Sequence, residues 1–205
     1  MKRQARDLVE AYARPFYEKP ERHYHNWFHI VSMLFGYSRD ISDELYLATV
    51  FHDIVYEPMA PDNEEKSCEA FLHFFERYDL KSSLDFRPVD TDKVQTLIMS
   101  TKKHIFIAAS EKGWDEDTHQ IVRRDLDILW STPSVFEEYE GNIRKEFAHK
   151  MSGVSKYQYL DGREAFMNSL KKYLLGTRML MSWETEGLKA NMKWLRNKIA
   201  AEKSR

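Results

Sequence analysis

The stretch LYLATVFHDIVYEP, residues 45–58, sets a histidine–aspartate pair, His52–Asp53, inside a strongly apolar segment. Its apolar side chains recur at helical spacing, which predicts a buried helix ending near Tyr56, and the prolines that follow predict a loop. A charged aspartate in such a segment costs several kcal/mol unless it is paired or binds a metal. The pair therefore points to a metal site. The alternative is an aspartate that caps a turn beside a core histidine.

A second unusual stretch, YHNWFHI at residues 24–30, carries His25 and His29 four positions apart. In a helix this spacing places both imidazoles on one face, while Trp27 and Phe28 are predicted to point toward the core. Two such imidazoles can bind one metal, or one can bind it while the other delivers a proton to the substrate. The alternative is a pair of histidines at the surface or at the edge of the core.

Three further polar residues, two aspartates and a histidine, lie within or just after apolar helical patterns later in the chain. Asp125 and Asp127 lie in IVRRDLDILW, residues 121–130, where one is expected to face outward and the other could point into a cleft. The alternative is a pair of solvated aspartates that contact neighbouring arginines. His104 follows an apolar helix face and suits a phosphate contact or a second metal. It equally suits a helix C-terminus, where the helix dipole favours a cation.

Helical periodicity runs through almost the whole chain, and no convincing β alternation or internal repeat interrupts it. Pro133 is expected to open a long helix. The tail from Tyr157 to Lys203 predicts two or three more helices, with breaks near Gly176 and Ser182. A length of 205 residues suits one all-α domain with a substantial core.

Composition narrows the classes of function and the compartment. A net charge of −2 without a dominant basic cluster argues against a dedicated nucleic-acid surface. Cys68 is the only cysteine, which excludes an internal disulfide and a cysteine-based zinc site and fits a reducing compartment. The polar N-terminus is not that of a signal peptide, and no run approaches the ~20 apolar residues of a membrane span. We therefore expect a cytoplasmic protein without a membrane partner.

The order of these motifs resembles the H…HD…D pattern of the HD superfamily of metal-dependent phosphohydrolases. YHNWFHI followed by FHD is similar to the corresponding motifs of cyclic-nucleotide phosphodiesterases. RHYHNWFHI, FHDIVYEP with DNEEKS, TKKH, and DLDIL followed by IRKEF and DGR resemble a group of predicted HD phosphohydrolases, and they extend from Arg22 to Arg163. The resemblance implies a single HD-type helical bundle over residues 1–205, with a C-terminal helical extension.

The resemblance also implies roles for individual residues. Asp53 would help activate water and could bridge two metals, and His25 would donate a proton to the leaving oxygen. Asp127 would replace Asp125 if the register differs by two. Tyr56 departs from the pattern, because it occupies the place of a second histidine in the phosphodiesterases. The implied metal ligands are His29, His52, Asp53 and Asp125, and the candidate substrate contacts are Arg22, Glu64 and His104.

The implied activity is hydrolysis of a phosphoester in a nucleotide or a small phosphorylated metabolite, by water that a divalent metal activates. One or two ions of Mn, Mg, Zn, Fe or Co per chain would serve as cofactor. A di-iron oxygenase is one alternative, which would need further ligands from His73, His104 or His119. A non-catalytic nucleotide-binding module is another. The aromatic-rich helical tail could support a homodimer.

Overall fold

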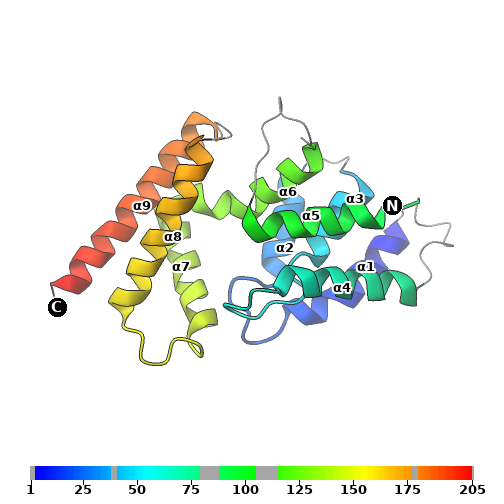
Figure 1. Cartoon of the computed structure of the whole chain (residues 1–205), viewed down its shortest axis with the longest axis horizontal. Helices are drawn as coiled ribbons and strands as arrows, with labels where there is room; N and C mark the ends of the chain where they lie inside the picture. The colour runs from blue at the N-terminus through cyan, green and yellow to red at the C-terminus, as the bar shows by residue number, and fades with distance from the viewer. Residues whose placement is uncertain (1–2, 38–40, 79–87, 105–114, 177–179, 205) are drawn as a thin grey trace. The chain divides into compact units, whose positions relative to one another are not determined.

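The computed structural model describes residues 3–37, 41–78, 88–104, 115–176 and 180–204 (Figure 1). These ranges hold nine α-helices, one 3-10 helix and no strand, which confirms the all-α class. The helices are α1 (Arg3–Tyr17), α2 (Trp27–Gly36), α3 (Asp43–Phe51), α4 (Asn63–Arg77), α5 (Thr91–Lys103), α6 (Glu116–Leu126), η1 (Asp127–Trp130), α7 (Pro133–Phe147), α8 (Lys156–Gly176) and α9 (Ser182–Lys203).

The chain groups into two compact units, with the boundary between Asp125 and Leu126. Helices α1 to α6 form the first unit, and η1 with α7 to α9 forms the second. One domain over residues 1–205, with a C-terminal helical extension, stays a prediction. In the described ranges, every helix is too short or too polar to cross a lipid bilayer.

Helix α3 is the centre of the first unit. It contacts α1, α2, α4 and α5, and α4 and α5 lie side by side against each other (Figure 1). All residues from Leu45 to Phe51 are buried, so this helix is apolar on every side, as a central helix must be. Asp43 and Glu44 lie in its first turn, and the Ser42 side chain caps its N-terminus by accepting from Leu45 N at 2.9 Å.

The apolar periodicity predicts a helix that ends near Tyr56. In the structure α3 ends earlier, at Phe51, and a turn follows. The last four carbonyls of a helix need partners outside it, and here each has one. The oxygens of residues 48 and 51 accept from backbone N–H groups of the turn, and Thr49 O lies 2.9 Å from His52 Nδ1. The Tyr17 hydroxyl donates to Val50 O at 2.8 Å. Local satisfaction of these carbonyls lets the helix stop inside the core.

Helix α2 differs from the prediction in its start and in its buried face. It begins at Trp27, with Asn26 as N-cap, so His25 precedes the helix and does not share a helical face with His29. Its buried residues are His29, Ile30 and Met33. Phe28 was expected in the core but is 79% exposed, because the buried face follows His29 and turns Phe28 outward.

Helix α6 is fixed to the rest of the first unit by its N-terminal aspartate, Asp117. This carboxylate accepts from Ser42 Oγ at 2.7 Å and pairs with Lys93 Nζ at 2.7 Å. One residue thereby ties the start of α6 to the start of α3 and to α5. Farther along, the Arg124 side chain lies close over Gly36, where an added Cβ would come within 3.0 Å of Arg124 Cδ. These contacts fix the direction of the helix that carries Asp125.

The second unit contains η1 and three longer helices. Pro133 is at the start of α7, as predicted, and α8 and α9 pack side by side (Figure 1). The break expected near Gly176 and Ser182 is present, since α8 ends at Gly176 and α9 begins at Ser182. The buried carboxylate of Glu140 is neutralised by the Arg163 guanidinium at 2.8 Å, so the unit tolerates an acid in its interior.

We expect Tyr17→Phe to lower the free energy of unfolding by about 1–2 kcal/mol, since it leaves the buried Val50 carbonyl without its hydroxyl donor. Burial raises the pKa of Tyr17 well above its ordinary value, so the hydroxyl stays protonated and able to donate. Urea unfolding followed by circular dichroism measures the loss.

Tyr12→Phe is the matched control for Tyr17→Phe. The Tyr12 ring packs against Phe51 and Phe74, and within the described residues its hydroxyl makes no hydrogen bond. Equal stability changes in the two variants would contradict the proposed role of the Tyr17 hydroxyl.

Candidate metal centre

Four side chains from three segments of the first unit meet at the end of α3. One potential ligand atom from each of His29, His52 and Asp53 lies within 4.8 Å of the other two. Asp125 joins them, with its Oδ1 3.2 Å from His29 Nε2 and 3.7 Å from His52 Nε2. His29 is 5% exposed, His52 1% and Asp53 9%, so the cluster is withdrawn from water. The four ligands implied by the motif resemblance thus come together in the fold.

The His52 imidazole is oriented as metal-binding histidines commonly are. His52 Nδ1 lies 2.9 Å from Thr49 O, a carbonyl that can only accept, so Nδ1 carries a proton and Nε2 is the nitrogen that faces the cluster. In metal sites a backbone carbonyl commonly holds a ligating histidine in this way.

The Nε2 atoms of His29 and His52 are buried without a hydrogen-bond partner among the described residues. Carboxylate oxygens nevertheless lie 3.2 Å from each of them. These contacts are close but lack the direction that a hydrogen bond requires. Side chains that converge on a shared cation have this property, because their lone pairs point to a common centre and not at one another. Two imidazole nitrogens and two carboxylates suit borderline divalent ions such as Zn, Mn or Fe.

The electrostatics of the cluster show how strongly its members depend on one another. Burial alone would lower the pKa of His52, but the carboxylates of Asp53 and Asp125 outweigh it and raise that pKa well above its ordinary value. Burial would raise the pKa values of both aspartates. For Asp53 the charge of His52 reverses this effect. For Asp125 the hydrogen bond from His104 and the nearby imidazoles of His29 and His52 do so, and both carboxyl pKa values are lowered. Each of these buried groups therefore depends on the opposite charge of its neighbours.

Asp125, from the stretch IVRRDLDILW, is the fourth member of the cluster. Its side chain is 14% exposed, and its two oxygens contact His29, His52 and His104. Asp127, the substitute considered from the sequence, lies in η1 and belongs to the second unit.

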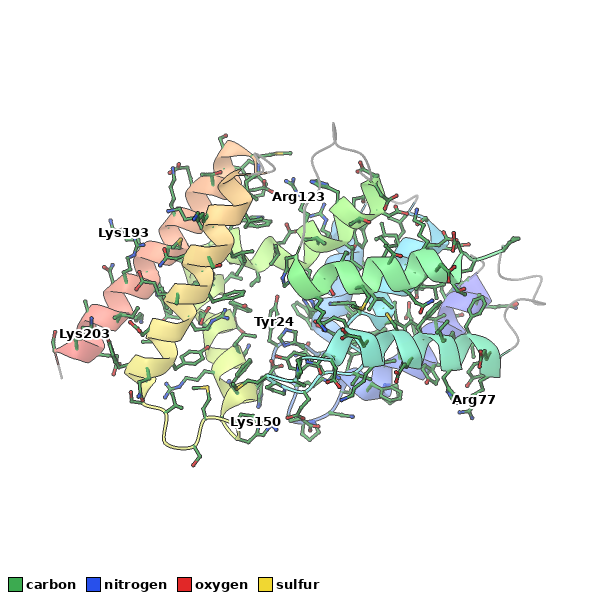
Figure 2. All side chains as sticks on the ribbon, in the orientation of Figure 1. Tyr24, Arg77, Arg123, Lys150, Lys193 and Lys203 are labelled. Atoms are coloured by element: carbon green, nitrogen blue, oxygen red, sulfur yellow. The ribbon has the colours of Figure 1, made fainter. Side chains whose placement is uncertain are left out.

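His25 lies beside the cluster, in the segment before α2. Its ring centroid is 6.0 Å from that of His29, and the ring stacks on Tyr56 at 4.0 Å with an interplanar angle of 26°. Tyr24, labelled in Figure 2, contacts the rings of both histidines at 5.0 Å. Tyr56 therefore supports His25 from the position where the phosphodiesterase pattern has a second histidine. His25 is adjacent to the ligands without being one of the three clustered by distance.

Arg22 was a candidate phosphate contact, but the structure gives its guanidinium other partners. The side chain is buried at 7% exposure, and it donates to Asp53 O at 2.6 Å, to Ile54 O at 2.9 Å and to His25 O at 3.1 Å. These carbonyls belong to the two segments that carry the histidine motif and the His52–Asp53 pair. Arg22 therefore joins the two motifs, and a substrate phosphate is not among its contacts.

Glu64 and His104, the other two candidate substrate contacts, lie at helix ends in the first unit. Glu64 is half-buried in the first turn of α4, where burial raises its pKa and the nearby Asp53 charge adds to the increase. Lys102 Nζ is 3.9 Å from Glu64 Oε2. His104 contacts Asp125, with its Nε2 3.1 Å from Oδ2. Of the two, His104 is the one that makes a hydrogen bond to a candidate ligand.

Some supporting residues were missed in the sequence, although one of them carries a recognisable signal. Asn26 accepts from Phe28 N and His29 N, and an asparagine just before an apolar periodic run is a common N-cap signature. The partner of His52 is a backbone carbonyl, which no side-chain pattern can reveal.

Comparison with known proteins found no matching family model, no matching curated protein and no matching solved structure. The resemblance to HD phosphohydrolases therefore continues to depend on the motifs themselves.

We expect binding of a divalent metal to release a proton and to tighten as the pH rises. Although burial opposes it, the two carboxylates raise the pKa of His52, so at neutral pH the imidazolium proton must leave before a cation can bind. The dissociation constant for Mn²⁺ should fall about tenfold per pH unit for each proton released. Calorimetry in two buffers of different protonation enthalpy counts the protons, and binding independent of pH would contradict this expectation.

We also expect Arg22→Lys to destabilise the protein by about 1–3 kcal/mol, because one ammonium group cannot bridge carbonyls on two segments as the guanidinium does. Metal affinity should fall with it, since the turn that carries Asp53 loses its anchor. Arg14→Lys is the control, as Arg14 is exposed and pairs with Glu18. Unchanged stability with a raised KM for a phosphoester would instead support the phosphate contact.

Proposed function

We propose that this protein is a metal-dependent phosphohydrolase that cleaves a phosphoester of a nucleotide or a small phosphorylated metabolite. The observation that carries the proposal is the convergence of His29, His52, Asp53 and Asp125, together with the two buried Nε2 atoms that no hydrogen bond satisfies. The order of the motifs, which resembles that of HD phosphohydrolases, supports the reaction class.

The donor set fits a divalent cation, with His29, His52, Asp53 and Asp125 as the residues that would hold it. When bound, the cation would supply Lewis-acid chemistry, making water a better nucleophile near neutral pH and neutralising charge on the phosphoryl group. The two carboxylates offset the two positive charges of such an ion, so the buried site would be close to neutral. That balance reduces the cost of burying four polar side chains.

The remaining chemistry is assigned to two residues of the chain. Asp53 would accept or hold the proton of the attacking water, since its carboxylate lies in the cluster, 3.2 Å from His52 Nε2. His25 would donate a proton to the departing oxygen, since it lies next to the ligands and is held by the Tyr56 ring. A positioned proton donor contributes typically about 10²–10⁴-fold in rate.

The near-neutral net charge favours a small phosphorylated substrate over a polymer. The two alternatives receive no added support. Within the described residues, three or more potential metal ligands cluster at one place, at His29, His52 and Asp53, and His73 is exposed on α4. The di-iron alternative therefore gains no second ligand cluster there. The non-catalytic module differs from the enzyme only in turnover, which an assay decides.

The first experiment combines metal analysis with a substrate panel. The purified protein is stripped of metal, titrated with Mn²⁺, Mg²⁺, Co²⁺ and Zn²⁺, and assayed with nucleoside monophosphates, cyclic nucleotides and nitrophenyl phosphates. The proposal expects metal-dependent release of phosphate or of the alcohol, and loss of both binding and turnover in Asp53→Asn. Tight metal binding without turnover of any phosphoester would favour the binding module.

We expect His25→Ala to retain metal but to lose about 10²–10⁴ in kcat on esters with poor leaving groups. The loss should be much smaller on nitrophenyl esters, whose leaving group departs without a proton. His23→Ala is the control, because His23 is exposed and lies two residues earlier. An empty metal site in His25→Ala, or equal losses on both kinds of ester, would contradict a proton-donor role.

A further inference from the structure

His104 combines a contact to a candidate ligand with an unfavourable backbone conformation. It is the C-cap of α5, with φ 48° and ψ 46°, in the left-handed region. Among the described residues, only one other residue besides glycine, Met59 at φ 67°, has a positive φ. A side chain with a Cβ costs free energy in this region, and helices usually place glycine or asparagine there.

The conformation brings the His104 imidazole onto Asp125. Its Nε2 lies 3.1 Å from Asp125 Oδ2 in hydrogen-bonding geometry, and since a carboxylate can only accept, Nε2 carries the proton. The other carboxylate oxygen, Oδ1, lies 3.2 Å from His29 Nε2. One oxygen is thus held by His104 while the other faces the cluster.

We propose that His104 is a positioning residue, which binds neither substrate nor metal but orients Asp125 so that a single carboxylate oxygen faces the metal centre. This inference rests on the proposed metal site and adds a residue to it. It replaces the substrate contact expected from the sequence, because the donor nitrogen of His104 is already engaged by a candidate ligand. Partners of this kind fix the direction of a ligand, and removing one typically weakens metal binding about 10–100-fold.

The backbone helps to test the proposal, because it separates positioning from stability. His104→Gly removes the imidazole and its hydrogen bond to Asp125, but it also removes the conformational penalty at a positive φ. Since these two effects on stability oppose each other, the metal-free variant should have a Tm close to that of the wild type. Its dissociation constant for Mn²⁺ should nevertheless rise about 10–100-fold. A residue that only supports the fold would lower the Tm instead.

Met59→Gly is the matched control. It relieves the other positive φ, and the Met59 side chain is 71% exposed. This variant should have a Tm equal to or above that of the wild type while keeping wild-type affinity. His104→Asn provides a second variant, since asparagine tolerates the left-handed region but has a shorter side chain. The absorption spectrum of the Co²⁺-loaded protein reports directly on the ligand geometry, and it should change in both His104 variants but not in Met59→Gly.

The outcomes separate the two proposals. Wild-type protein that binds no divalent metal would overturn the proposed function and the role of His104 together. Wild-type protein that binds metal, with equal affinity and an identical Co²⁺ spectrum in His104→Gly, would overturn only the role of His104. A lower Tm in His104→Gly, with a raised Tm in Met59→Gly, would also overturn it, because His104 would then be needed for folding.

Discussion

The first unit depends on one electrostatic constraint, which is that two imidazoles and two carboxylates are buried together at the end of its central helix. Taking such groups out of water costs several kcal/mol each unless opposite charges meet them. His29, His52, Asp53 and Asp125 come from α2, from the turn after α3 and from α6, so they compensate one another only when these elements are correctly placed. The geometry of the site therefore depends on the packing of the unit. Both depend on α3, which is buried on every side.

The backbone carbonyls around the cluster also have hydrogen-bond donors. Tyr17 donates to the carbonyl of residue 50, and Arg22 donates to those of residues 53 and 54. Ser67 Oγ contacts both N and O of Val55, at 3.2 and 3.3 Å. Buried peptide groups in a non-helical turn need such partners, because no helix ladder satisfies them. The result is a turn with little freedom, which is the property required of a segment that presents two neighbouring ligands.

Local signals in the sequence predicted much of the fold. Periodicity predicted the all-α class, and proline and glycine predicted the start of a helix at Pro133 and the break between Gly176 and Ser182. The convergence of His29, His52, Asp53 and Asp125 followed from ordered motifs. The buried face of α2 could not be predicted in the same way. A histidine, His29, lies on the core face while Phe28 is exposed, so hydrophobicity alone selects the wrong face. The backbone contacts of Arg22 could not be predicted, because an arginine beside a motif looks the same whether it holds a phosphate or backbone carbonyls.

Convergence alone does not distinguish a metal site from a self-compensating ion network, since a protonated His52 also offsets carboxylate charge. The direction of the contacts favours the metal site that we propose. A network built for stability would align each N–H with an oxygen, as His104 does with Asp125. At His29 and His52 the nitrogens instead lie 3.2 Å from carboxylates without that alignment, while His52 Nδ1 makes a well-placed contact with Thr49 O. One cluster thus contains aligned contacts around its edge and unaligned ones at its centre, as we expect of the cation site that we propose.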